Sequence, residues 1–395
     1  MQVGDTLTRA AALAAAFVCL GCADSPEPPP HIAPLDCPAA AASAYNGFGL
    51  DLLKALADES PEANTTLSPV GVTTVLSTIA PALHPEAQAA LWRTLRTEAL
   101  SVPDLGAALQ ALASWRSYSK GEVLFQSVTA VWLAAGTTLP PGVADRCRFV
   151  FGAHVKTLPA DHEAAITHVN DWVREATHGR IRRATPELVS KEPLVVTNAA
   201  HFDGAWKHPF DRSDTEKATF HLVGSRTKTV PMMRRTSDLR YFAGSRFEAV
   251  ALPYADPRFE FVLCLPAAAS TLSAFVAGLD ASSWDALLAG LHPCKVELGL
   301  PRFVLDSSAD LEGPLVDLGA APLFSKDLRG YRLAALHHAV RVRVFEEGTE
   351  ADAATFAGLQ SAAPAWLVVD RPFFFAIRET GSGLLLFTGL VFDPS

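Results

Sequence analysis

FEEGTEADAATFA, residues 345–357, is the stretch that decides the fold of this chain. It continues RVRV at 341–344, which is typical of a β-strand because β-branched residues favour extended backbone. After two glutamates and a glycine the side chains become small, and no proline interrupts them before position 364. A core strand uses larger side chains and a surface loop uses turn residues, so this composition is typical of neither.

The segment alternates in character with the period of a β-strand. In extended backbone, successive side chains point to opposite faces, so residues two apart share a face. All charges after Gly348 fall on one face, and the other face could be buried without desolvating an ion. The pattern therefore predicts a segment that is first exposed and later enters a sheet. The uncharged face holds Thr349, Ala351, Ala353, Thr355, Ala357, Leu359 and Ser361, and the opposite face holds Glu350, Asp352, Ala354 and Phe356.

This pattern resembles the hinge of the reactive loop in serpins, the serine protease inhibitor family. Six further stretches resemble serpin motifs and occur in the family's order, so the resemblance spans nearly the whole chain after about residue 40. They are NTTLSPVGVTT (64–74), HVNDWVREATHGRIRRATPEL (168–188), LVVTNAAHFDGAWKHPF (194–210), VPMM (230–233), ELGLPRF (297–303) and DRPFFFAIRETGSGLLLFTGLVFDP (370–394).

The coarse hydrophobic patterns favour an α+β fold, because helical periods dominate the first half and strand-like runs the second. No linker or repeat interrupts residues 39–395, which predicts one domain. The resemblance implies a serpin fold with three β-sheets, eight to nine helices and an exposed reactive-centre loop. The expected helices cover 42–57, 87–95, 164–176 and 272–291, and the expected strands cover 128–133, 194–202, 259–265, 340–345 and 384–392.

The first 38 residues predict export. Arg9 precedes an apolar run too short to span a bilayer, which is typical of a signal peptide over residues 1–21. The run ends in Cys19-Leu20-Gly21-Cys22, which resembles a bacterial lipoprotein cleavage site with Cys22 as the acylated residue. A proline-rich tether would occupy 22–38. We expect an outer or cell-surface membrane lipoprotein; ordinary secretion and absence of export are the alternatives.

Composition argues against several other functions. A net charge of −9 is unlike a nucleic-acid binder, and RIRR at 180–183 is interpreted as solvated surface. No catalytic, phosphate-binding or metal motif is present in the sequence, so neither an enzyme nor a cofactor is expected. His337 and His338 are adjacent and would point to opposite faces of a strand, which prevents shared metal ligation. Gly381-Ser382-Gly383 predicts a hairpin turn. Free thiols are favoured for the four cysteines that follow Cys22, although three pairings remain open: Cys37, Cys147, Cys264 and Cys294.

The resemblance also implies roles for individual residues. Trp206 matches the tryptophan at the breach, where the loop first enters the main sheet. Ser68, Asn198 and His337 match the shutter, a polar cluster that latches the central strands, while Gly71 stands where the family usually has serine. Glu346 is expected to pair with a cation. The hinge would comprise Glu346, Glu347, Gly348, Thr349, Glu350, Ala351, Ala353 and Ala354.

The implied activity is irreversible inhibition of a serine protease through loop cleavage, acyl-enzyme trapping and loop insertion from a metastable state. Counting from the hinge places the reactive bond at Ala362-Ala363, and counting back from Asp370 places it at Ser361-Ala362. Small side chains there favour an elastase-like or subtilisin-like target, and the protein is expected to be a monomer. The alternatives are a non-inhibitory serpin, acting as a binding module or a protease substrate, and cross-class inhibition of a papain-like cysteine protease.

Overall fold

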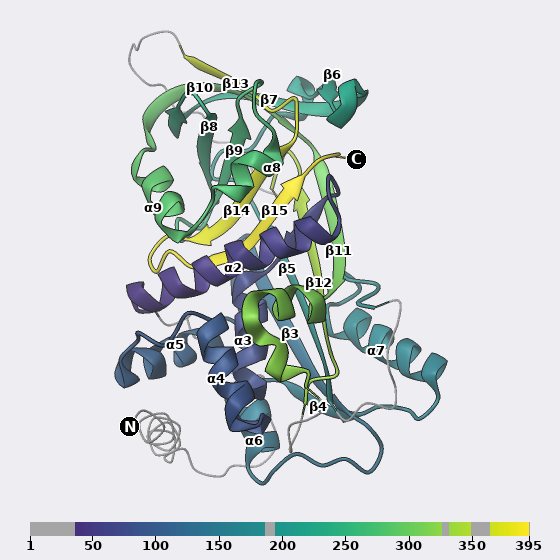
Figure 1. Ribbon diagram of the computed structural model, residues 1–395. Coiled ribbons are helices and arrows are strands. Elements are labelled where there is room, and N and C mark those ends of the chain that lie inside the picture. Colours follow the sequence, from purple (N-terminus) through teal and green to yellow (C-terminus); the bar gives the residue numbers. More distant parts are fainter. Residues whose placement is uncertain (1–35, 186–193, 326–331, 349–363, 395) are drawn as a thin grey trace.

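The computed structural model describes residues 36–185, 194–325, 332–348 and 364–394. A six-stranded sheet forms one half of the molecule (Figure 1), with strand order β11-β12-β5-β3-β2 and β4 paired to β3. Strand β5 lies at its centre and is buried along almost its whole length, which explains why most of its residues are apolar although Asn198 and His201 interrupt them. The strands are β2 (Ser117–Lys120), β3 (Val123–Leu133), β4 (His154–Thr157), β5 (Leu194–Gly204), β11 (Phe303–Asp310) and β12 (Ala335–Val344).

A nine-stranded sheet forms the other half, in the order β1-β15-β14-β9-β8-β7-β10-β13 with β6 paired to β7. The long strand β7 pairs with β10 from Met232 to Tyr241 and with β8 only near its end, from Arg240 to Ala243. Strand β7 therefore joins the strands on its β8 side to those on its β10 side in one sheet. The described residues thus form two sheets where three were expected. The strands are β1 (Thr65–Leu67), β6 (Glu216–His221), β7 (Thr227–Ala243), β8 (Phe247–Pro253), β9 (Phe259–Pro266), β10 (His292–Pro301), β13 (Ala365–Val368), β14 (Phe373–Glu379) and β15 (Leu385–Val391).

Nine α-helices lie in the part of the chain that the structure describes. The predicted helix over 272–291 is two helices, because Asp280 forms a capping box with Ser283 and starts a second helix. The other three predicted helices and all five predicted strands are confirmed with shifted ends. The helices are α2 (Ala39–Glu59), α3 (Pro69–Ile79), α4 (Pro85–Thr94), α5 (Val102–Ser114), α6 (Val143–Phe149), α7 (His162–Ala176), α8 (Leu272–Ala277), α9 (Ala281–Ala289) and α10 (Glu312–Leu315).

Helix α7 covers one face of the six-stranded sheet (Figure 1). It begins at the N-cap Asp161, whose carboxylate accepts from the Ala164 amide, and it buries Ala165, Val169 and Trp172 at helical spacing. These side chains meet small residues on the strands beneath, including Ala199 of β5 and others such as Ala130, Ala335 and Ala339. We call the side of the sheet that α7 covers the α7 face. Alternate residues of β5 and β12 point to this face.

The central strands β5 and β12 run parallel and pair directly from Ala335–Val195 to Val342–Phe202. No strand lies between them over this register. We call this line of pairing the seam. The hinge begins where the chain leaves the end of β12. A segment that turned back there would reach the seam, which is closed because β5 and β12 pair directly.

Several predictions fall outside the described residues. These are the signal peptide, Cys22 and most of the tether, the hinge positions Thr349, Glu350, Ala351, Ala353 and Ala354, and the reactive-bond residues Ser361, Ala362 and Ala363. No helix in the described part of the chain is long and apolar enough to cross a membrane.

Candidate functional site: the breach and the shutter

The hinge begins in contact with the end of β5. The backbone amide of Trp206 donates to the carbonyl of Glu347 (3.2 Å), and that of Phe210 donates to the carbonyl of Glu346 (2.8 Å). Gly348 has a positive φ of 73°, and a Cβ there would lie 2.3 Å from the carbonyl oxygen of Gly204. Only glycine fits this position. The structure therefore brings the hinge residues Glu346, Glu347 and Gly348 into contact with the segment that contains Trp206.

Trp206 fixes the end of β12. Its indole Nε1 donates to the carbonyl of Phe345 at 2.9 Å. Its ring stacks on Tyr254, with centroids 4.6 Å apart and planes 11° from parallel, and meets Phe261 edge-on. Trp206 is buried in the core shared by the two sheets. It is thus both a core aromatic and a direct contact of the hinge.

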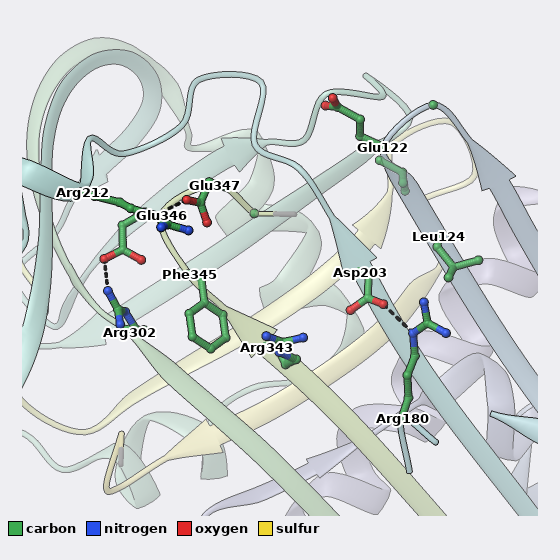
Figure 2. A pocket seen from close by; sticks show the side chains of 13 residues that line it. Glu122, Leu124, Arg180, Asp203, Arg212, Arg302, Arg343, Phe345, Glu346 and Glu347 are labelled. Carbon is green, nitrogen blue, oxygen red and sulfur yellow. Dashed lines mark hydrogen bonds and ion pairs between the residues drawn. The ribbon is translucent and has the colours of Figure 1, made fainter. Parts of the chain in front are cut away.

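Glu346 has the cationic partner that the sequence predicts without identifying. Its carboxylate pairs with Arg302 and accepts from the Thr215 hydroxyl at 2.7 Å. Burial alone would raise the pKa of Glu346, but the bonds from Arg302 and Thr215 outweigh it and lower that pKa. The next residue, Glu347, pairs with Arg212. Figure 2 shows both pairs beside Phe345 at the end of β12. Two ion pairs therefore hold the first hinge residues.

The shutter contains His338 rather than the predicted His337. The Ser68 backbone amide donates to Nε2 of His338 at 2.9 Å, which links the start of α3 to β12. His338 lies opposite Asn198 in the register of β5. His337 points to the α7 face instead, since neighbours on a strand alternate. The prediction of His337 in this cluster is wrong by one position.

Asn198 holds the neighbouring strand of the shutter. Its Nδ2 donates to the Ser127 hydroxyl, the Thr129 hydroxyl and the Val128 carbonyl at 3.0–3.2 Å, all on β3. Its Oδ1 has no hydrogen-bond partner in the described structure and faces Gly71. The serine expected from the family at Gly71 is replaced here by close packing of the Asn198 amide.

Replacing Gly71 by alanine is expected to destabilise the protein. The new Cβ would lie 2.8 Å from Asn198 Oδ1 and 3.0 Å from Ser68 Oγ. Overpacking of this kind costs about 1–3 kcal/mol, which exceeds the gain of up to about 1 kcal/mol from helix propensity. The midpoint of thermal unfolding should fall for Gly71→Ala and rise slightly for the control Gly106→Ala in α5, where no atom lies within 4 Å. A rise for both variants would show that the shutter tolerates a Cβ.

Acidification is expected to weaken the closed sheet through His338. Burial lowers the pKa of His338 to about 3, and burial also lowers the pKa of His337 and that of His201, the latter to about 4. The unfolded chain binds these protons near pH 6.5 and the folded chain does not. The free energy of unfolding is therefore highest above pH 6.5. It falls as the pH drops towards 3, by up to about 1.4 kcal/mol per pH unit for each histidine.

The measurement is the free energy of unfolding at pH 7, 6 and 5. In His338→Gln the free energy of unfolding should fall less between pH 7 and pH 5 than in the parent, by the contribution of one histidine, because glutamine does not titrate. The control His162→Gln removes an exposed histidine and should leave the slope unchanged. Equal slopes for His338→Gln and the parent would contradict the assignment.

The four cysteines that follow Cys22 are free thiols, as favoured from the sequence, and Cys264 is fully buried as expected. No group of residues that could hold a metal ion occurs in the described part of the chain. Arg302 and Thr215 belong to the site but were missed in the sequence. ELGLPRF contains Arg302, yet nothing in that motif links it to Glu346.

Comparisons with known proteins agree with this geometry. The family model named Serpin, described as serine protease inhibitor, matches residues 43–394. Glia-derived nexin of Mus musculus is 28% identical over 366 residues, covering 88% of this chain and 91% of that protein. An uncharacterized serpin-like protein of Thermococcus kodakarensis is 30% identical over 370 residues, covering 89% of this chain and 85% of its own length.

A solved structure has the same fold. The crystal structure of tengpin, a thermophilic serpin in its native state, matches with a TM-score of 0.81 at 20% identity, covering 92% of this chain and 96% of that one. The predicted α+β serpin fold is thereby confirmed, with nine α-helices among the described residues and with the strands in two sheets where three were expected.

Proposed function

Since this chain belongs to the serpin family, we propose that it inhibits a serine protease by loop cleavage and insertion. One observation carries the proposal: β5 and β12 are closed on each other along the seam, and the hinge starts at the end of that seam against Trp206. A segment that follows β12 and turns back at this point would enter antiparallel to both strands. The uncharged alternation from Thr349 to Ser361 suits that entry.

The proposed chemistry begins as ordinary proteolysis. The serine Oγ of the protease attacks the carbonyl carbon of the reactive bond, forms an ester, and expels the amine of the following residue with a proton. The upstream segment then enters the seam, adds ladder hydrogen bonds and buries small side chains. Loop insertion of this kind is a known way for serpins to release stored strain. The attached protease is displaced before water can cleave the ester.

The reactive bond selects the target. Ser361, Ala362 and Ala363 offer side chains that suit the small primary pockets of elastase-like and subtilisin-like enzymes. Arginine-selective and aromatic-selective pockets would be left unfilled. Pro364 disfavours cleavage directly before it, so attack falls on Ser361-Ala362 or Ala362-Ala363.

We propose that the inhibitor acts outside the cytoplasm. Residues 1–21 would direct export, and an acyl group on Cys22 would anchor the protein to a membrane through the tether of residues 22–38. The proposed partner is the target protease, held as a covalent acyl complex by one inhibitor monomer.

The test is to incubate the chain lacking residues 1–21 with elastase, subtilisin and papain, and to separate the products on a denaturing gel. A band at the summed mass that survives boiling, formed with elastase or subtilisin, would support the proposal. Its mass-mapped end would identify the reactive bond. Clean cleavage without such a band would favour the non-inhibitory alternative, and a complex formed with papain alone would favour the cross-class one.

A further inference from the structure

A second cluster of charged residues lies on the α7 face of the six-stranded sheet, below the breach. The turn after α7 and the strands β5 and β12 enclose a pocket of about 220 Å³ there. Four guanidinium groups and a single carboxylate line this pocket. It is therefore a cluster of positive charge in a chain whose net charge is −9. The charged and polar lining used below is Arg180, Arg182, Arg341, Arg343, His201 and Asp203. Two of these arginines come from RIRR, which was interpreted from sequence as solvated surface.

The pocket lies across the seam. His201 of β5 and Arg341 of β12 are direct neighbours in the parallel register. Arg341 Nη1 donates to the carbonyl of Arg180 at 3.0 Å and pairs with Asp306 at 3.2 Å. Arg180 in turn donates to Asp203 of β5 at 2.8 Å. Both strands and the turn after α7 are therefore connected around one cavity.

His201 is the observation that points to a ligand. Its side chain is 1% exposed, and neither ring nitrogen has a hydrogen-bond partner in the described structure. Buried polar atoms are nearly always paired, so one that lines a cavity without a partner indicates a missing acceptor or donor. Burial lowers the pKa of His201 to about 4, which leaves the ring neutral with one N–H to donate.

Two of the four arginines have no carboxylate partner among the described residues. Arg343 lies over the ring of Phe345, 4.8 Å from its centroid, and Arg182 is exposed. Guanidinium groups bind phosphate oxygens through paired N–H donors, so unpaired arginines around a buried N–H donor suit an oxyanion. The pocket adjoins a larger one of about 790 Å³, which also contains Arg180, Asp203 and Arg343 and is drawn in Figure 2.

We propose that this pocket binds a small phosphate-type oxyanion, and that the bound anion holds β5 and β12 together and opposes opening of the seam. The proposal of a binding site depends only on this cluster of residues. The proposed effect of the anion on loop insertion rests on the proposed function. Insertion would separate His201 from Arg341 and dismantle the site. A ligand that binds the closed sheet better than the open one stabilises the closed sheet by linkage. The larger neighbouring pocket leaves room for an organic group on the phosphate.

Binding is tested by titration calorimetry of the chain lacking residues 1–21 with inorganic phosphate, at an ionic strength held constant with sodium chloride. We expect saturable binding that weakens at least fivefold in Arg343→Gln and in Arg182→Gln. Arg183→Gln is the matched control, because Arg183 belongs to the same basic run, is exposed and does not line the pocket. Phenyl phosphate in place of phosphate distinguishes a phosphomonoester ligand from the free ion. Absence of saturable binding, or equal weakening in all three variants, would overturn the site.

The effect on the seam is tested without any protease. Hydrogen exchange of the backbone amides in 195–202 and 335–342 should slow at least threefold on adding phosphate to the parent, and Arg343→Gln should need at least fivefold more phosphate for the same slowing. Saturable binding with unchanged exchange would contradict the stabilisation of the seam. Slowed exchange in a protein that forms no protease complex would refute the proposed inhibition and leave the anion site standing.

Discussion

Under the proposed mechanism, Ala353→Arg is expected to convert the protein from an inhibitor into a substrate. Ala353 lies on the uncharged side of the hinge alternation, which would face inward when the segment enters the seam. Burying an unpaired guanidinium costs several kcal/mol, and about 1.4 kcal/mol already changes a ratio tenfold. Insertion would then lose to hydrolysis of the acyl-enzyme. The number of inhibitor molecules consumed per protease inactivated should rise at least about tenfold.

The matched control is Ala354→Arg, which places the same side chain on the opposite, charged side of the alternation. It should inhibit nearly as well as the parent, because its guanidinium would stay in solvent. Circular dichroism should show the fold intact in both variants. If both arginines impair inhibition equally, or neither does, the alternation does not govern insertion.

Trp206→Ala is expected to destabilise the uncleaved protein by about 3–5 kcal/mol, the usual effect of truncating a buried tryptophan. The substitution removes the stacked contact with Tyr254 and the edge contact with Phe261. It also leaves the carbonyl of Phe345 without its indole donor. Denaturant unfolding monitored by circular dichroism measures the change.

Trp206→Phe separates the two contributions. It keeps an aromatic ring against Tyr254 but loses the N–H, so part of the packing and none of the hydrogen bond remains. We expect a smaller loss than for alanine, with about 0.5–1.5 kcal/mol of it due to the hydrogen bond. A loss below about 1 kcal/mol for alanine would mean that the breach is held elsewhere.

Much of the fold could be predicted because its central elements have strong local patterns. Strand β5 is rich in apolar and β-branched residues since both of its faces are covered, and the apolar residues of α7 recur at helical spacing. The break between α8 and α9 was missed, because Leu272–Ala277 and Ala281–Ala289 both carry helix-forming residues. Only the capping box at Asp280 marks the boundary, and a short polar cap is weak against a long hydrophobic pattern.

The shutter shows where sequence reasoning loses resolution. Strand β12 is buried on both faces from Ala335 to Val340. Alternation of polar and apolar residues is therefore absent there, and nothing in the sequence decides which histidine faces Ser68. The three-dimensional register decides it, by placing His338 opposite Asn198. The partnership of Glu346 with Arg302 and Thr215 is equally hidden, since it joins three distant segments without a shared period.

The strands that follow the hinge segment bear on how a cut molecule would behave. Any cut between Gly348 and Pro364 would leave a short C-terminal peptide containing β13, β14 and β15, which pair with β10, β9 and β1. Its phenylalanines Phe373, Phe374 and Phe375 are fully buried. The peptide would stay bound, so gel filtration and native mass would report an intact molecule. A preparation cleaved during purification would have the native mass of the intact protein until it was denatured. Its content of uncleaved inhibitor is therefore measured by titration against active protease rather than by size.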